Sequence, residues 1–226
     1  MTENIQPETE TQQRIDDKPN RRVVTDLIEH AKQSATPAEL GTIIRTDPIL
    51  CYAFVAEFGS SGAVPREYIT SCRQAIELMG LPLLIEWLEA ALEHAVDVPK
   101  FTRCVRDTLI RARFMELMGR STMKREETED LYLVGLFSQL DKLVDMSLPE
   151  LILPLPFSED VRSAILEQLG RIGRLLKFAQ TIESADEAGI DFMQTNMHLP
   201  SIQVYDAYNE AYDWMKEVEA KVTANA

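Results

Sequence analysis

The histidines are the first residues to consider, because metal-dependent catalysis commonly relies on imidazole ligands. The chain has three, His30, His94 and His198, and they lie far apart in the sequence. None stands in an HxxxH or HExxH spacing, which would place two imidazoles on one helix face to share a metal ion. We therefore expect no metal site, no bound cofactor, and histidines that lie at the surface or near helix ends.

The three cysteines, Cys51, Cys72 and Cys104, form neither a CxxC pair nor a Cys/His zinc spacing. An odd number of widely spaced cysteines indicates neither a zinc finger nor a disulfide framework. We expect buried free thiols, which behave as small apolar side chains. The sequence also contains no GxSxG, Walker or GxGxxG motif, so these hydrolase and nucleotide-binding signatures are missing.

One stretch of the chain differs in charge from the rest. The 226 residues carry a formal net charge of −14, whereas residues 100–125 alone carry +6. The eight cations of this stretch are Lys100, Arg103, Arg106, Arg111, Arg113, Arg120, Lys124 and Arg125. Two interpretations stay open. The cations pair with acidic neighbours inside the same helical bundle, or they form a docking face for an acidic partner or a phosphate-bearing ligand.

Length and composition limit the classes of protein that remain. A chain of 226 residues with 45% apolar and 27% charged residues is long enough to bury a sizeable core. The acidic charge argues against DNA or RNA as a partner, since nucleic acids bind basic surfaces. The first residues lack the apolar segment of a signal peptide, and no apolar run approaches the roughly 20 residues that span a bilayer. We expect a soluble, cytoplasmic protein without membrane insertion.

Apolar residues recur every three or four positions from Val23 onward, and strand-like alternation is missing. This pattern predicts an all-α fold, whereas the polar residues 1–22 predict a disordered tail. We expect Asp47 to cap a helix that begins at Pro48, and residues 131–137 to be the most buried stretch. Proline, glycine and capping residues predict ten helices, at about 23–34, 37–45, 48–58, 70–79, 82–95, 100–119, 128–145, 159–169, 171–184 and 201–221. Residues 59–65 are expected to form a loop.

Several segments, read together, resemble a known family. Residues 45–88 contain Asp47-Pro48-Ile49-Leu50, then Ser60-Ser61, then Gln74-Ala75-Ile76 followed by Met79-Gly80. The likeness continues in IRARFMELMG (110–119), LYLVGLFSQLDKLVDMSLPELI (131–152), LPFSEDVRSAIL (155–166) and YNEAYDWM (208–215). In this order and spacing they resemble the HDOD domain over about residues 23–220. The likeness is greatest to the HDOD half of bacterial EAL–HDOD signalling proteins.

The resemblance implies an orthogonal multi-helix bundle of the HD-like (HDOD) type. It would form a single domain over residues 23–221, with sub-bundles at about 23–97 and 98–221. HD-type phosphohydrolases carry a Gly-Leu-x-His-Asp metal-binding signature. The matching stretch here begins at Gly135-Leu136, so the His-Asp pair falls on Ser138 and Gln139. A hydroxyl and an amide are poor replacements for an imidazole and a carboxylate at a di-metal centre.

The resemblance therefore implies a non-catalytic signal-transduction module that acts through protein–protein contacts. Its partner would be a protein of a bacterial signalling pathway, with cyclic-di-GMP, kinase and motility pathways as candidates. The candidate interaction or ligand groove comprises Arg106, Arg111, Arg113, Ser138, Gln139 and Asp141.

Two alternatives stay open. One is a sensor that binds a nucleotide such as a cyclic dinucleotide in this groove, with Arg106, Arg111 and Arg113 pairing with its phosphates. The other is a residual HD-type phosphohydrolase. Because only 22 residues precede the predicted domain, we expect no EAL phosphodiesterase domain ahead of it, and hence no cyclic-di-GMP hydrolysis by such a domain in this chain.

Overall fold

The computed structural model describes residues 18–60, 69–97, 101–123 and 125–223. Within these ranges it contains twelve α-helices, one short 3-10 helix and a single isolated β-bridge, so the all-α prediction is confirmed. The elements are α1 (Arg21–Lys32), α2 (Pro37–Ile44), α3 (Pro48–Ser60), α4 (Cys72–Met79), α5 (Leu81–His94), α6 (Arg103–Thr122), α7 (Arg125–Phe137), η1 (Leu140–Lys142), α8 (Leu148–Ile152), α9 (Glu159–Glu167), α10 (Gly170–Glu183), α11 (Glu187–Met197) and α12 (Ser201–Thr223).

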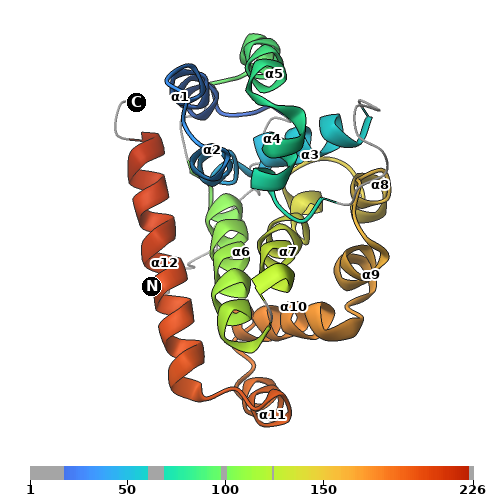
Figure 1. Ribbon diagram of the computed structural model, residues 1–226. Helices are drawn as coiled ribbons and strands as arrows, with labels where there is room; N and C mark the ends of the chain where they lie inside the picture. The colour runs from blue at the N-terminus through green and yellow to red at the C-terminus, as the bar shows by residue number, and fades with distance from the viewer. Residues whose placement is uncertain (1–17, 61–68, 98–100, 124, 224–226) are drawn as a thin grey trace, which may run out of the picture.

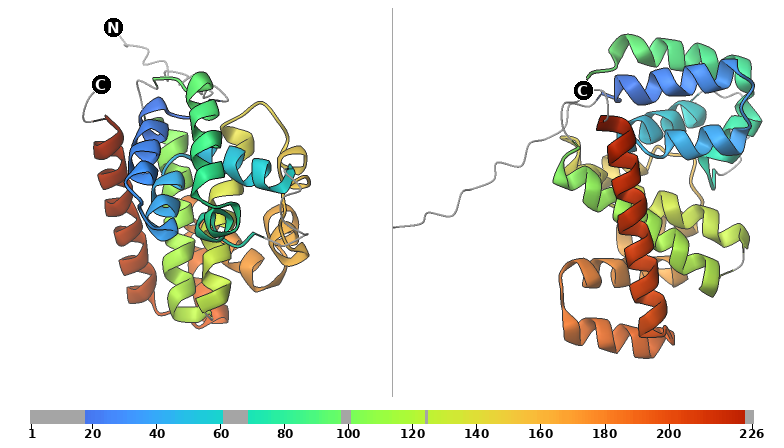
Figure 2. Two further views of the ribbon diagram at one scale, coloured as in Figure 1. Left: turned by 45° about the horizontal axis from the view of Figure 1, so that its top comes forward. Right: turned by 90° about the vertical axis from the view of Figure 1, so that its left-hand side faces the viewer.

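The helices cross one another in layers rather than forming one parallel bundle (Figures 1 and 2). Helices α1 to α5 gather at one end of the molecule, and α10 and α11 lie at the other (Figure 1). Between the two ends, α6 packs against α7 at the centre, and α12 runs along α6. The central helix α6 therefore contacts elements from both halves of the chain.

A capping residue sets the start of α3, as predicted. Asp47 caps α3, because its Oδ1 accepts hydrogen bonds from the backbone N–H groups of Ile49 at 2.9 Å and Leu50 at 3.1 Å. Its other oxygen accepts from the backbone N–H of Asn20 at 2.6 Å. Burial raises the pKa of Asp47, although these three backbone donors act against that rise. One carboxylate thus joins the start of α1 to the start of α3.

The folded region begins earlier than predicted. The Asn20 side chain caps α1 by accepting from the backbone N–H of Arg22, and Pro19 is buried. The Arg21 N–H donates to the Val96 carbonyl at 2.9 Å, and the Val96 N–H donates to the Pro19 carbonyl at 3.0 Å. The predicted tail boundary at residue 22 is therefore corrected: residues 18–22 belong to the fold, where polar capping residues resemble a tail in sequence. Residues 1–17 lie outside the described residues.

The middle of the chain needs three further corrections. The helix predicted at 128–145 ends at Phe137, and the chain continues into η1, although the expected burial of residues 131–137 is confirmed. Gly59 and Ser60, expected in a loop, are the last residues of α3, and 61–68 lie outside the described residues. Helices α8 and α11 were not predicted. The first has only five residues, and the second buries none of its side chains, so neither shows a long apolar stripe.

Candidate functional site

The cations of α6 are paired with carboxylates. The ion pairs are Arg103–Asp107, Arg106–Glu219, Arg111–Glu183, Arg113–Glu116, Arg113–Glu210 and Arg120–Glu116. The interpretation in which the cations pair with acidic neighbours in the bundle is confirmed for Arg106, Arg111 and Arg113, whereas Arg103 and Arg120 pair with carboxylates of α6 itself. Lys100 and Lys124 lie outside the described residues, as does the side chain of Arg125.

Arg111 is the most deeply buried of the five, with a side chain that is only 3% exposed. Its Nε and Nη2 both donate to the carboxylate of Glu183, the former at 2.7 Å. Its Nη1 donates to the Ser138 hydroxyl at 3.0 Å. With its amide oriented to satisfy these donors, Gln139 places its oxygen 2.6–3.2 Å from the three guanidinium nitrogens. One buried positive charge is thus enclosed by a carboxylate and two neutral oxygens.

Close approach of α7 to α6 makes this enclosure possible. A Cβ on Gly135 would lie 2.6 Å from the Cα of Ala112, so only glycine allows the two helices this close. Beyond Gly135, Ser138 reaches Arg111, and its hydroxyl also donates to the Gly135 carbonyl at 2.8 Å. Glu183 is the last residue of α10, at the negative end of the helix dipole, where a nearby cation is favourable.

The structure brings together three of the six predicted site residues: Arg111, Ser138 and Gln139. Arg106 lies farther along α6, where its Nε donates to both oxygens of Glu219 on α12 at 3.1 Å. Asp141 is exposed on η1, and none of the hydrogen bonds or ion pairs among the described side chains joins it to the other five. Arg113 belongs to a different cluster.

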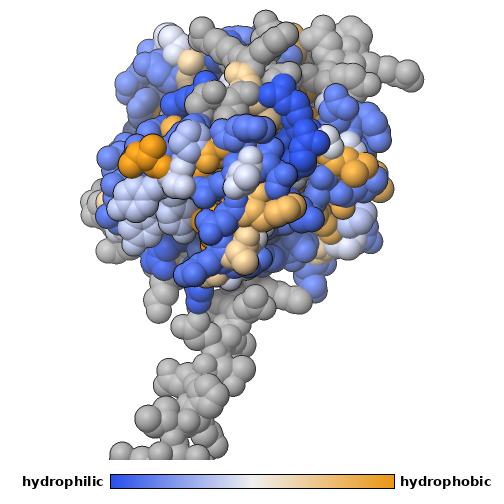
Figure 3. Space-filling view, turned by 90° about the horizontal axis from the view of Figure 1, so that it is seen from below, coloured by the Kyte–Doolittle hydropathy of each residue, from blue (hydrophilic) through white to orange (hydrophobic). Residues whose placement is uncertain are grey.

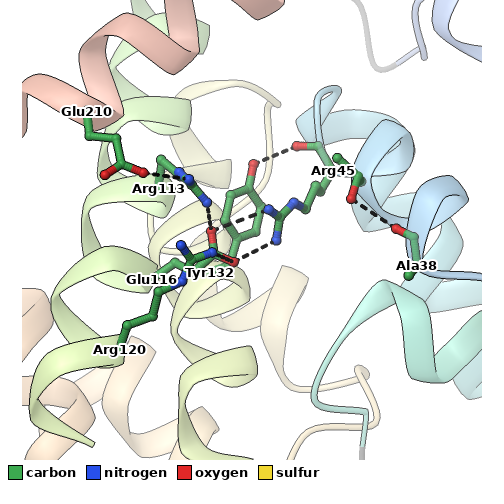
Figure 4. Close-up of polar contacts among 8 residues, drawn as sticks. Ala38, Arg45, Arg113, Glu116, Arg120, Tyr132 and Glu210 are labelled. Carbon is green, nitrogen blue, oxygen red and sulfur yellow. Dashed lines mark hydrogen bonds and ion pairs between the residues drawn. The ribbon is translucent and has the colours of Figure 1, made fainter. Parts of the chain in front are cut away.

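That second cluster centres on the Glu116 carboxylate of α6 and was not predicted (Figure 4). Arg45, at the end of α2, donates to its two oxygens at 3.1 and 3.3 Å. Arg113 donates to Glu116 at 2.7 Å with one nitrogen and to Glu210 on α12 at 2.9 Å with another. Arg120 contributes a longer contact of 3.4 Å. A single carboxylate therefore links the N-terminal helices to α6, and through Arg113 to α12.

Aromatic rings cover this cluster. The Arg45 guanidinium lies 4.4 Å from the centre of the Tyr132 ring, and the Tyr132 hydroxyl donates to the Arg45 carbonyl at 2.7 Å. Trp214 stands edge-on to Tyr132 with 6.2 Å between ring centres. Burial acts to raise the pKa of Glu116, but Arg45 and Arg113 outweigh burial and hold that pKa below its ordinary value. Glu116 is therefore a fixed anion of the fold.

Two of the three thiols lie close to the Glu116 cluster, since Cys51 and Cys72 both interact electrostatically with Arg45. Cys51 and Cys72 are buried free thiols, as predicted, whereas Cys104 is only partly buried. The contact of 3.4 Å between the Cys51 and Cys72 sulfurs was not predicted. In the described part of the chain, no three or more histidine, cysteine, aspartate or glutamate side chains are grouped as metal ligands. No helix in these same ranges is both long enough and apolar enough to cross a membrane.

Comparison with known proteins gives partial matches. No protein-family model matches the chain. Over 150 residues, or 66% of its length, the chain is 30% identical to the protein named cyclic di-GMP phosphodiesterase CdgJ of Vibrio cholerae. Over 196 residues, or 83% of its length, it is 25% identical to the uncharacterized protein YuxH of Bacillus subtilis. The chain spans 35% of the first relative and 46% of the second, so less than half of each.

A solved structure shares the fold. The crystal structure of the MmoQ response regulator from Methylococcus capsulatus superimposes with a TM-score of 0.61. The superposition covers 92% of this chain and 98% of that one, at 15% sequence identity. At this identity the likeness establishes the helical architecture alone, because one fold hosts many functions.

Proposed function

We propose that the chain is a non-catalytic signal-transduction module of the HDOD type that acts by contact with a partner protein. The enclosure of Arg111 by Ser138, Gln139 and Glu183 is the observation that carries this proposal. In the resemblance to HD-type phosphohydrolases, Ser138 and Gln139 take the positions of the His-Asp metal ligands. Here the two side chains accept hydrogen bonds from a guanidinium.

A charge estimate supports a structural role for these positions. A divalent cation about 4 Å from a guanidinium meets a repulsion of about 8 kcal/mol at an effective dielectric constant of about 20. The negative charge of Glu183 is already matched by Arg111 through a two-pronged ion pair. An amide oxygen and a hydroxyl do not offset that repulsion. The cluster therefore suits a fixed, buried ion pair better than a metal-dependent hydrolase.

The names of the similar proteins support a role in bacterial signalling. One partial relative is named a cyclic di-GMP phosphodiesterase, and the protein with the shared fold is named a response regulator. Both names belong to bacterial signalling, and we place the partner of this chain in a pathway of that kind. A nucleotide bound by Arg106, Arg111 and Arg113 would have to displace Glu219, Glu183 and Glu116 respectively. Protein contact is therefore the function that we favour.

Affinity capture of the tagged chain from its native cells tests this proposal. Mass spectrometry of the co-purifying proteins should show one protein in reproducible, near-stoichiometric amount. The same chain unfolded by heat on the same resin is the control, because reversing Arg111 or Arg113 would break buried ion pairs. If the folded and abundant chain captures nothing beyond this control, the protein-contact function is wrong.

A further inference from the structure

An open groove lies between α10 and α11, and Met123 after α6 also borders it. It has a volume of about 670 Å³. The two helices form a hairpin at one end of the molecule (Figure 2), and apolar side chains interrupt the polar surface seen from that end (Figure 3). The apolar part of the lining comprises Met123, Leu175, Phe192, Met193, Met197 and Leu199.

Helix α11 is only partly covered by the fold: Ile190, Met193 and Met197 pack partly against the core, whereas Phe192 is exposed. None of its eleven residues is buried, and the Phe192 side chain is 69% exposed. The helix is nevertheless well ended, since Asp186 caps its start and His198 adopts a left-handed conformation at its end. Most helices gain their stability by burying one face. Phe192 and the exposed parts of Met193 and Met197 therefore form a surface at which a partner would bury apolar area.

The rim of the groove is basic. Arg171, Arg174 and Lys177 follow one another at three-residue intervals on α10, and all three are exposed. Asp186 also borders the groove, but its carboxylate accepts the cap hydrogen bond from the Gly189 N–H at 3.0 Å. A local row of cations in a chain of net charge −14 repels basic partners and attracts acidic ones.

Methionine side chains favour a helical occupant. The groove contains Met123, Met193 and Met197, and flexible thioethers adapt to the side chains of a bound helix. Grooves of this kind accept an amphipathic helix through apolar anchors spaced three and four residues apart. We propose that the α10–α11 groove binds an acidic amphipathic helix of a partner protein. This inference rests on the proposed function, for which it names the contact surface and the chemistry of the partner.

A designed peptide tests the groove directly. The probe is a fluorescein-labelled 18-residue helix with leucine on one face and glutamate on the other; its counterpart carries lysine in place of glutamate. Fluorescence anisotropy with the full chain should show saturable binding of the acidic peptide, at least about tenfold tighter than the basic one. The R174E/K177E double variant should weaken binding by about tenfold or more. Phe192→Ala should weaken binding about fivefold, since an aromatic anchor is lost.

A matched control distinguishes an effect of the groove on peptide binding from an effect of the net charge of the chain. The K18E/K221E double variant makes the same charge change at exposed positions, near the far end of α12. It should bind the acidic peptide within about twofold of the unaltered chain. All variants should keep the helical circular dichroism and urea midpoint of the unaltered chain, because the substituted side chains are exposed.

Affinity capture with the same variants separates failure of the groove from failure of the proposed function. Loss of the captured protein in R174E/K177E, but not in K18E/K221E, would support the groove as its docking site. If neither peptide binds while R174E/K177E still captures a stoichiometric partner, the groove assignment is overturned and the proposed function stands. The groove assignment would also be overturned, in favour of a nucleotide site, if cyclic di-GMP bound saturably and displaced the peptide. Arg174→Glu would then abolish the binding of cyclic di-GMP.

Discussion

The guanidinium of Arg111 on α6 and the hydroxyl of Ser138 beyond α7 are joined by a hydrogen bond of 3.0 Å. Ser138 and Gln139 take the positions of a His-Asp metal-ligand pair in the resemblance to HD-type enzymes, and both contact this guanidinium. The positive charge at this point of the fold therefore belongs to a side chain. Through Ser138 and Glu183, Arg111 links α6 to the segment after α7 and to the end of α10.

Replacing Arg111 by methionine should destabilise the fold strongly. The change removes a buried cation and leaves Glu183 and Gln139 without their donor, so we expect a loss of about 3 kcal/mol in the free energy of unfolding. This loss is measured by urea denaturation, with unfolding monitored by circular dichroism. Arg103→Met is the matched control: that side chain is 83% exposed, so its change should stay within about 0.5 kcal/mol. Equal effects of the two substitutions would show that the buried pair carries no special stability.

Glu116→Gln should lower the free energy of unfolding about as much as the Arg111 substitution does. The Glu116 carboxylate balances the charges of both Arg45 and Arg113. We expect a loss of about 3 kcal/mol, since two largely buried cations lose their common partner. Glu210→Gln removes the outer carboxylate of the same cluster, which is 57% exposed, and should cost less than about 1 kcal/mol. Thermal and urea unfolding of the two variants, measured side by side, would give the two losses in stability. A larger effect at Glu210 would contradict the central role of Glu116.

The lowered pKa of Glu116 predicts how the free energy of unfolding depends on pH. Burial acts to raise its pKa, but Arg45 and Arg113 hold it below the ordinary value of 4.5. The unfolded chain then binds this proton more readily, so the stabilisation is present above pH 4.5 and is lost as the pH falls through the folded value. The unfolding free energy of the unaltered chain should therefore fall more steeply in acid than that of Glu116→Gln. Parallel curves for the two proteins would rule out this contribution.

The three thiols should react at very different rates. Burial, followed by the contact with Cys72, raises the pKa of Cys51 well above its ordinary value, and both sulfurs lie inside the core. Burial also raises the pKa of Cys104, but this side chain is partly exposed. A pulse of N-ethylmaleimide on the native protein should label Cys104 more than about tenfold faster than the other two. The Cys104→Ser variant should show no fast adduct, and rapid labelling of Cys51 would contradict the packing of α3 against α4.

Elements set by neighbouring residues could be predicted from the sequence, whereas the clusters that join distant residues could not. The start of α3 follows from Asp47-Pro48, because a cap acts over three residues. By contrast, Arg45 and Glu116 lie 71 residues apart, and Arg111 and Glu183 lie 72 apart. The sequence did show Glu116 as one of only two anions among eight cations, which signals a shared partner. Helix α11 has only a short apolar stripe, formed by Ile190, Met193 and Met197, and it buries none of its residues fully, so its sequence showed a weak helical pattern.

Metal binding and phosphodiester hydrolysis, measured together on the purified chain, test the non-catalytic function most directly. The protein would be incubated with Mn²⁺, Fe²⁺ or Ni²⁺, desalted, and examined by elemental analysis and by assays with cyclic di-GMP and bis(p-nitrophenyl) phosphate. We predict no stoichiometric metal, and hydrolysis no faster than in buffer alone. Stoichiometric metal with turnover that is lost in Gln139→Ala or Asp141→Ala would contradict this function and indicate a metal-dependent hydrolase instead.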